Sequence, residues 1–459
     1  CVPSNSLLLS ASKGVAWEDA VARRDEVTGG LDDSGAAGRL AAAGVTVFRG
    51  TGVVTGPGEV SVASASGTTS LTWDDLVIAT GCEPVAPPIE GLSDIPTWTT
   101  AEALCSPDLP RRLLVLGGGA AGCELAQIFA AFGSQVTLIE ADAGLLPGEA
   151  AFAGEILTAA LRRAGVEIML GSPATKAERT PEGLTLALQD GTLVDADRLL
   201  LATGRRPRLT GLGLDALGIT VAPGQALPTD ASCHVVGASH VWAAGDVTGI
   251  THTHASRYQA DVVAGNLLFG ASLREADYSA IPRCVYTVPS VYAVGEPGRA
   301  GLSVARVLLS DTARGRLGGD DLGRLELYAA EGVLVGAVAV GPDAATWMAE
   351  VTLAIRAKIP VTVLADVVHA FPTYGEALQA AFRELAAVAA VATVPEEKGI
   401  GPLSELSMET PEDDALEQHR ELVPDEAVTV PRRDTRFDVD EADAAEQARA
   451  VGFDDDDYR

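Results

Sequence analysis

The sequence predicts an α/β protein followed by an α+β domain and an acidic tail. Three features indicate this: apolar runs that end in glycine turns, helical segments between those runs, and a change of pattern near residue 278. Short apolar runs bounded by such turns are typical of buried parallel strands, and their alternation with helices indicates an α/β architecture. The apolar runs cover residues 76–79, 113–116, 199–202 and 241–244. Beyond residue 278, strand-like segments at 324–328 and 333–340 precede a helical segment at 344–357.

Composition excludes several classes of function. The chain has 459 residues, is 47% hydrophobic and carries a net charge of −30. This charge argues against nucleic acid as a partner, because phosphates bind basic groups. Runs of about 18 apolar residues are missing, so we expect no membrane span. Its six cysteines are scattered without a CxxC pair, which fits the reducing cytoplasm and predicts no metal site.

The last part of the chain differs from the rest. Residues 395–459 hold 21 acidic and 7 basic residues, few large apolar ones, and a run of four aspartates. Such a segment buries too little apolar surface to offset the entropy lost on ordering. We therefore expect a disordered acidic tail, for which the sequence names no partner.

The most informative motif starts at the second apolar run. Three glycines follow that strand at the spacing GxGxxG: Gly117 permits a tight turn, Gly119 lets the backbone approach a pyrophosphate, and Gly122 allows close helix–strand packing. A second strand, at 135–139, ends in Glu140, which suits the hydroxyls of a ribose and repels a 2′-phosphate. The next basic residue is Arg162. The motif predicts a dinucleotide site that prefers NADH to NADPH.

Together with this motif, further segments resemble the pyridine nucleotide-disulfide oxidoreductase family. They occur in the family's order over residues 1 to about 394, and they include a redox-cysteine segment, two ATG turns, a second flavin motif and two stretches of an interface domain. The segments are Cys1-Val-Pro-Ser, Ile78-Ala-Thr-Gly, Ala202-Thr-Gly-Arg-Arg-Pro, Ala243-Ala-Gly-Asp-Val-Thr-Gly, Ile281-Pro-Arg-Cys-Val-Tyr-Thr and His369-Ala-Phe-Pro-Thr.

The resemblance implies two Rossmann-like nucleotide-binding domains, with an FAD domain interrupted by an NAD domain, and a C-terminal α+β domain that forms a homodimer. The implied boundaries are 1–105 and 229–277 for the FAD domain, 106–228 for the NAD domain and 278–394 for the interface domain, before the tail at 395–459. The family's initial GxGxxG unit and first redox cysteine have no counterpart here, so we expect the sequence to begin partway through the fold.

The resemblance also implies functional residues. Cys1 and Glu376 match catalytic positions, Cys1 as the second redox cysteine and Glu376 as the carboxylate that orients an acid–base histidine. The residues expected to bind FAD or NAD are Asn5, Gly52, Thr80, Gly81, Gly117, Gly118, Gly119, Ala120, Ala121, Gly122, Glu124, Glu140, Gly204, Arg205, Gly245, Asp246, Thr253 and His254.

Two departures from the family concern the nicotinamide side of the site. Asn5 stands where the family has a lysine that pairs with the glutamate matching Glu124. We expect Glu124 to bond Asn5 instead or to take up a proton, since an unpaired buried carboxylate is costly. Ala120 stands where many members have a tyrosine, which implies an open nicotinamide pocket.

The largest departure is Phe371, which stands where disulfide reductases of the family have their acid–base histidine. Phenylalanine cannot move a proton, and His369 should point elsewhere. We therefore expect an FAD-dependent NADH oxidoreductase whose small-molecule acceptor, such as a quinone, need not be a disulfide. Two alternatives stay open: a dihydrolipoamide dehydrogenase-like disulfide reductase with another acid, and an inactive flavoprotein that serves as a sensor or scaffold.

Overall fold

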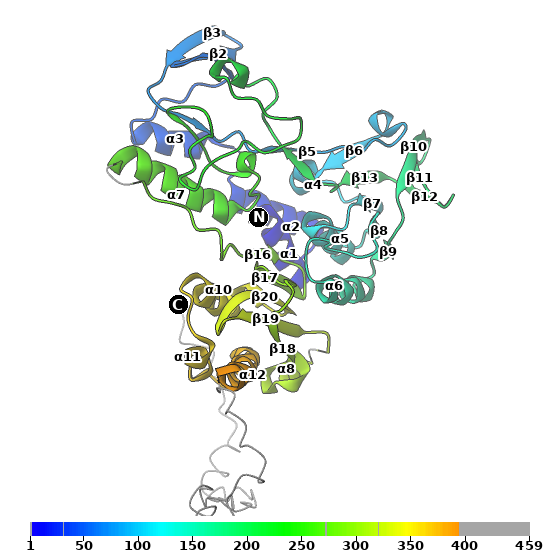
Figure 1. Cartoon of the computed structure of the whole chain (residues 1–459). Helices are drawn as coiled ribbons and strands as arrows, with labels where there is room; N and C mark the ends of the chain where they lie inside the picture. The colour runs from blue at the N-terminus through cyan, green and yellow to red at the C-terminus, as the bar shows by residue number, and fades with distance from the viewer. Residues whose placement is uncertain (1, 31, 271–272, 320, 394–459) are drawn as a thin grey trace, which may run out of the picture. The chain divides into compact units, whose positions relative to one another are not determined.

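The computed structural model describes residues 2–30, 32–270, 273–319 and 321–393 (Figure 1). Cys1 and the tail expected at residues 395–459 lie outside this part of the chain. The predicted fold class is confirmed, since parallel sheets with flanking helices precede an antiparallel sheet with its own helices. None of the described helices combines the length and apolar character needed to cross a membrane.

The chain begins with helices and a small antiparallel sheet. Glycine at position 29 ends α2 with a positive φ, the usual way to stop a helix. Strands β1, β2 and β3 then pair in sequence order. The helices are α1 (Val2–Ser12), α2 (Trp17–Thr28) and α3 (Ser34–Ala42), and the strands are β1 (Thr51–Gly56), β2 (Glu59–Ser64) and β3 (Gly67–Thr72).

Two of the predicted apolar runs pair although they lie far apart in the sequence. Strand β4 (Leu76–Ile78) is parallel to β15 (Val241–Ala243), and Leu76 lies opposite Val241 in the register. The chain between them leaves through β5 (Cys82–Pro84) and returns through β14 (Arg205–Pro207), and these two strands are antiparallel neighbours. One unit is thus interrupted by another, as the resemblance implies.

The inserted unit contains a five-stranded parallel sheet, here called the central sheet, in the order β6-β13-β7-β8-β9. Helices α5 and α6 connect its parallel strands, and a three-stranded antiparallel sheet follows β9. The elements are β6 (Thr97–Thr99), α4 (Thr100–Cys105), β7 (Arg112–Leu116), α5 (Ala120–Ala131), β8 (Gln135–Ile139), α6 (Ala151–Arg163), β9 (Glu167–Met169), β10 (Ala174–Thr180), β11 (Gly183–Leu188), β12 (Leu193–Ala196) and β13 (Arg198–Leu201).

The last unit contains a five-stranded antiparallel sheet in the order β16-β17-β20-β19-β18. Its core includes Leu325, Leu327 and Phe382, all fully buried. The elements from β15 onward are η3 (Asp246–Thr248), α7 (Thr253–Phe269), β16 (Arg283–Val285), β17 (Ser290–Gly295), β18 (Ser303–Leu308), α8 (Ala313–Gly318), β19 (Arg324–Ala330), β20 (Val333–Gly341), α9 (Ala344–Trp347), α10 (Ala349–Arg356), α11 (Val361–Ala365) and α12 (Gly375–Thr393).

One apolar cluster connects the units around α5. Leu7 of α1, Trp17 of α2 and Phe129 of α5 belong to it, together with Val291 of β17 and Val340 of β20. All five side chains are at most 6% exposed. The first helices, the central sheet and the C-terminal sheet therefore share a core, and Figure 1 shows α1 and α2 beside α5.

Candidate active site

The glycine turn between β7 and α5 is closed on one side and open on the other. Gly117 has a φ of +110°, and a Cβ there would lie 2.5 Å from the carbonyl oxygen of Ala202. At Gly122 a Cβ would lie 1.9 Å from the carbonyl oxygen of Gly117, so any side chain would push the helix off the turn. Around Gly119, the N-cap of α5, an added Cβ would meet nothing within 4 Å. The free N–H groups at the start of α5 can therefore receive an anion at this open side.

Glu140 lies on the same turn. It follows β8, is 8% exposed, and its Oε2 accepts a hydrogen bond from the N–H of Gly118 at 2.5 Å. Its Oε1 accepts a second bond, from the N–H of Asp142 at 2.8 Å. Both oxygens are thereby fixed at the carboxyl edge of the central sheet, where open α/β sheets bind their ligands.

A second cluster forms around Asp246, where β5, β14 and η3 meet. The Cys82 thiol donates to Asp246 Oδ2 at 2.8 Å, and the Arg205 guanidinium reaches the same oxygen at 3.1 Å. Arg205 also donates to the carbonyl oxygen of Thr251 at 3.1 Å. Burial, and then the bond to Asp246, raises the pKa of the Cys82 thiol, so this group stays protonated and donates.

The two ATG turns are joined to each other beside this cluster. The Thr80 hydroxyl donates to the carbonyl oxygen of Arg208 at 2.7 Å, and the N–H of Arg208 donates to the carbonyl oxygen of Gly81 at 3.0 Å. Gly81 and Gly204 have φ values of +71° and +117°, which favour glycine. These bonds connect the outgoing and returning crossings between the two units.

The start of α7 lies next to the Asp246 cluster in the sequence. Thr253 is its first residue, and His254 donates through Nε2 to the carbonyl oxygen of Pro282 at 2.6 Å. Burial lowers the pKa of the neighbouring His252, and the charge of His254 adds to this effect. Within the described ranges, no three His, Cys, Asp or Glu side chains gather as metal ligands. The bond of His254 connects the start of α7 with Pro282, directly before β16.

Glu124 lies near the start of α5, where α1 and the C-terminal unit meet. Its Oε1 accepts a hydrogen bond from the N–H of Tyr286 at 2.8 Å, and the hydroxyl of Ser4 donates to it as well. Burial raises the pKa of Glu124 despite these two donors. Ser4, one residue before Asn5, thus supplies a hydroxyl to this carboxyl group, and uptake of a proton by Glu124 stays a prediction.

The candidate residues near the C-terminal end of the fold make contacts that the sequence did not predict. Glu376, at the start of α12, accepts hydrogen bonds from the N–H groups of Ala313 and Arg314 at 3.2 and 3.3 Å. These are the first two amides of α8, so the carboxylate satisfies donors that the helix itself leaves unpaired. Phe371 is 76% exposed. The side chain of His369 is 8% exposed and bonds through Nε2 to Glu350 at 3.0 Å.

Gly52 belongs to a different sheet from the strands that carry these clusters. It is an exposed residue of β1, opposite Val62 in β2. Strand β1 also contacts the segment after β14, through the N–H of Val54 and the carbonyl oxygen of Leu212 at 2.8 Å. The structure therefore places Gly52 in the small antiparallel sheet.

A cavity of about 700 Å³ lies beside the loop at 249–252 and was not predicted from the sequence. This loop forms one wall, and segments of the C-terminal unit form the others, including Ile281, Leu334 and Val335. At its edge Arg283 binds Glu149 through two hydrogen bonds, at 2.6 and 3.0 Å. Its volume is in the range of small-molecule sites. Five separate segments build it, so no local motif marks it.

Comparison with known proteins identifies the family. The model of the pyridine nucleotide-disulphide oxidoreductases matches residues 1–260, more than half of the chain, and the model of that family's dimerisation domain matches residues 281–382. The chain belongs to the pyridine nucleotide-disulphide oxidoreductases. It is therefore an oxidoreductase of the flavoprotein disulfide reductase class, with a dimerisation domain that is consistent with a homodimer.

Relatives in this family have known names. A dihydrolipoyl dehydrogenase of Thermus scotoductus is 34% identical over 395 residues, which cover 82% of each chain. A mercuric reductase of Shigella flexneri is 34% identical over 333 residues, which cover 68% of this chain and 57% of that protein. Among solved structures, the Cu(II) complex of the HOCl-induced flavoprotein disulfide reductase RclA from Escherichia coli has a TM-score of 0.76 at 26% identity, and the match covers 83% of this chain and 89% of that one.

Members of this oxidoreductase family use FAD and NAD(P)H, and the residues at the two clusters fit such groups. At the glycine turn, a Cβ on Gly118 would lie 2.6 Å from Leu145 Cδ2 and 3.0 Å from Glu140 Oε2, so glycine at this position lets Glu140 lie close to the turn, where a ribose would bind. At the second cluster, the carboxylate of Asp246 accepts hydrogen bonds from Cys82 and Arg205, and it can accept a further one from a hydroxyl. The roles of the individual site residues remain predictions.

Proposed function

We propose that this oxidoreductase takes electrons from NADH through FAD and passes them to a small acceptor other than a disulfide, such as a quinone. The observation that carries the proposal is Phe371. It stands at the position of the family's acid–base histidine and is 76% exposed, while Glu376, which would orient that histidine, is engaged by the amides of α8.

The chemistry of the acceptor decides between the candidates. Reduction of a disulfide releases a thiolate, which needs a positioned acid to become a thiol. His369 is held by Glu350 in a buried position and Phe371 has no proton to give. A quinone can take two electrons from reduced flavin and its protons from solvent, so it needs no such acid. The cavity beside the loop at 249–252 supports a small-molecule acceptor.

The chain's own residues have the following proposed tasks. The N–H groups at the start of α5 hold the pyrophosphate of NADH, and Glu140 accepts hydrogen bonds from its ribose. Asp246 binds the ribityl hydroxyls of FAD, with Cys82 and Arg205 fixing the carboxylate. When bound, FAD supplies two-electron transfer between the nicotinamide and the acceptor. Glu124 accepts hydrogen bonds from Ser4 of α1 and from the N–H of Tyr286, and so connects α5 with both.

The remaining proposals concern the domain boundaries, the oligomeric state and the cellular location of the protein. The FAD domain comprises residues 1–105 and 229–277, the NAD domain residues 106–228, and the interface domain residues 278–394, through which two copies form a homodimer. The scattered cysteines support a cytoplasmic location.

Anaerobic flavin reduction tests this function directly. The FAD-loaded protein is mixed with NADH, the loss of the oxidised flavin band is recorded, and then either a quinone or lipoamide is added. We expect NADH to bleach the flavin and the quinone to restore its absorbance at once, whereas lipoamide restores it slowly. A flavin that NADH does not bleach supports the inactive sensor or scaffold, and rapid reoxidation by lipoamide supports the disulfide reductase.

A further inference from the structure

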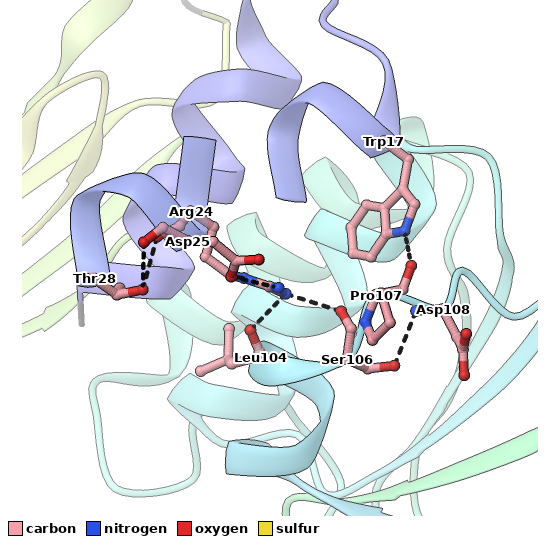
Figure 2. Close-up of polar contacts among 8 residues, drawn as sticks. All are labelled: Trp17, Arg24, Asp25, Thr28, Leu104, Ser106, Pro107 and Asp108. Carbon is pink, nitrogen blue, oxygen red and sulfur yellow. Dashed lines mark hydrogen bonds and ion pairs between the residues drawn. The ribbon is translucent and has the colours of Figure 1, made fainter. Parts of the chain in front are cut away.

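A buried clamp holds the segment that leads from α4 to β7. Figure 2 shows this segment, residues 104–108, with two side chains of α2 pointing at its backbone. The Arg24 guanidinium is 1% exposed and donates from Nη1 to the carbonyl oxygens of Leu104 and Ser106, at 3.0 and 2.8 Å. Its Nε donates to Asp25 at 2.9 Å. The segment is thereby tied to α2 before it enters the central sheet.

Trp17 forms the second half of the clamp. Its Nε1–H donates to the carbonyl oxygen of Pro107 at 2.7 Å, and the residue is 6% exposed (Figure 2). The indole also packs against the rings of Phe129 and Phe132 at the end of α5, with centroid distances of 5.6 and 5.1 Å. One side chain therefore connects α2 with both the incoming segment and the helix that follows the glycine turn.

The same pair of helices contacts α5 near its beginning. Helix α1 precedes α2 by four residues and packs on it, and the Ser4 hydroxyl of α1 bonds Glu124. The helix pair α1–α2 thus meets α5 at both ends. Helix α2 therefore contacts the segment at 104–108 directly and the beginning of α5 through α1.

The two side chains of the clamp do more than fill space, because both donate hydrogen bonds to backbone carbonyl oxygens. A guanidinium without exposure to water is costly to bury, and an apolar side chain of similar volume fills the same space without that cost. What only Arg24 provides is a rigid set of donors that fixes two carbonyl oxygens at once. Trp17 adds a third carbonyl, that of Pro107. The clamp therefore specifies where the backbone of residues 104–108 lies.

We propose that Arg24 and Trp17 are positioning residues for hydride transfer. They fix the spacing between α1, which starts at the redox segment of the family, and the glycine turn at the head of α5. The nicotinamide of an NADH molecule whose pyrophosphate is bound at that turn then meets the flavin at the required distance. Since displacement by about 1 Å can slow a positioned reaction about 100-fold, small movements of this joint affect the rate. The inference rests on the proposed reduction of flavin by NADH.

The test compares four variants of the FAD-loaded protein. Trp17→Phe keeps an aromatic ring but loses the N–H donor, Arg24→Met keeps the length but loses all donors, and Arg24→Lys keeps the charge. Arg23→Met is the matched control, because Arg23 is exposed on the same helix and pairs only with Glu26 among the described residues. Three quantities are measured: the flavin reduction rate at saturating NADH, the Kd for NAD⁺, and hydrogen exchange of the peptide spanning residues 104–109.

We expect Trp17→Phe and Arg24→Met to slow flavin reduction by about tenfold or more and to speed hydrogen exchange of this peptide, with the Kd for NAD⁺ changed less than about twofold. Arg24→Lys should recover part of the rate, and Arg23→Met should match the native protein. The inference is overturned if exchange rises while the reduction rate stays native, or if Arg23→Met slows reduction equally. Native protein that NADH fails to reduce instead overturns the proposed function, so the two failures are distinguishable.

Discussion

The carboxylate of Glu140 accepts a hydrogen bond from the N–H of Gly118, within the turn that separates β7 from α5. The carboxylate is thus fixed beside the turn, at the place where the adenine ribose of a dinucleotide would lie. A 2′-phosphate would meet this charge, whereas two ribose hydroxyls could donate to it.

Cofactor preference follows from this position. We expect kcat/KM with NADH to exceed that with NADPH by at least about tenfold, equivalent to about 1.4 kcal/mol. Glu140→Gln keeps an oxygen for the N–H of Gly118 but removes the charge, so the preference should shrink. Glu155→Gln, at an exposed position of α6, is the control and should leave the preference unchanged. Equal or better use of NADPH by the native protein contradicts the assignment.

The raised pKa of Glu124 predicts how stability depends on pH. Burial makes the folded state hold this proton more tightly than the unfolded chain, whose glutamate pKa is about 4.3. Between that pH and the higher folded pKa, the folded state binds more protons, so the free energy of unfolding falls as pH rises. Above the folded pKa the loss from this group is complete.

Glu124→Gln should therefore raise the free energy of unfolding near neutral pH and flatten its decline with pH, because the amide oxygen still accepts from the N–H of Tyr286. Urea unfolding at several pH values between about 5 and 8 measures both effects. Glu155→Gln again serves as the control. A less stable Glu124→Gln variant at neutral pH would mean that the charge is compensated in the folded state.

Glu376 should contribute to stability through α8. The Thr312 hydroxyl accepts from the N–H of Gly315, and Glu376 accepts from the two amides before it. We expect Glu376→Ala to lower the free energy of unfolding by about 1–2 kcal/mol and Glu376→Gln by less, because the amide keeps an acceptor. Urea unfolding measures the difference. Glu384→Ala, at an exposed position of the same helix, should have little effect, and an equal loss there would show that α12 itself is responsible.

Sequence patterns predicted the part of the site whose residues lie close together in the sequence. The strand, the glycine turn and Glu140 follow one another within 28 residues. Glycine is needed in the turn because a Cβ would collide with neighbouring backbone atoms, and the spacing of the glycines predicts this. The pairing of β4 with β15 could be inferred only from the family resemblance, because a short apolar strand can pair with many other strands.

Contacts with backbone atoms far away in the sequence were not predicted. Arg24 lies in a run of charged residues typical of a solvated helix face, yet its partners are carbonyl oxygens 80 and 82 residues later. Glu376 matches a family position, but its partners are amides 62 and 63 residues earlier. Carbonyl and amide groups occur at nearly every position, so no residue type marks such partners in a sequence.

Restoring the missing imidazole tests why disulfides should be poor acceptors. Phe371→His places an imidazole directly before Pro372, and in protein that carries both redox cysteines we expect lipoamide reduction to rise by at least about tenfold, toward the range of a positioned acid–base group. The gain should be partial, because Glu376 is already bonded to α8. Phe371→Leu is the control for simple loss of the ring. If Phe371→His gains nothing over Phe371→Leu, the acceptor site differs by more than one imidazole.

The ratio of two turnover measurements tests the central claim most directly. With saturating NADH and the FAD-loaded native protein, kcat/KM is determined for a benzoquinone and for lipoamide or glutathione disulfide. Because a positioned acid–base group contributes about 100- to 10,000-fold and Phe371 supplies none, we expect the quinone to be preferred by at least about 100-fold. Disulfide turnover as efficient as quinone turnover would contradict the account and would mean that another residue serves as the acid.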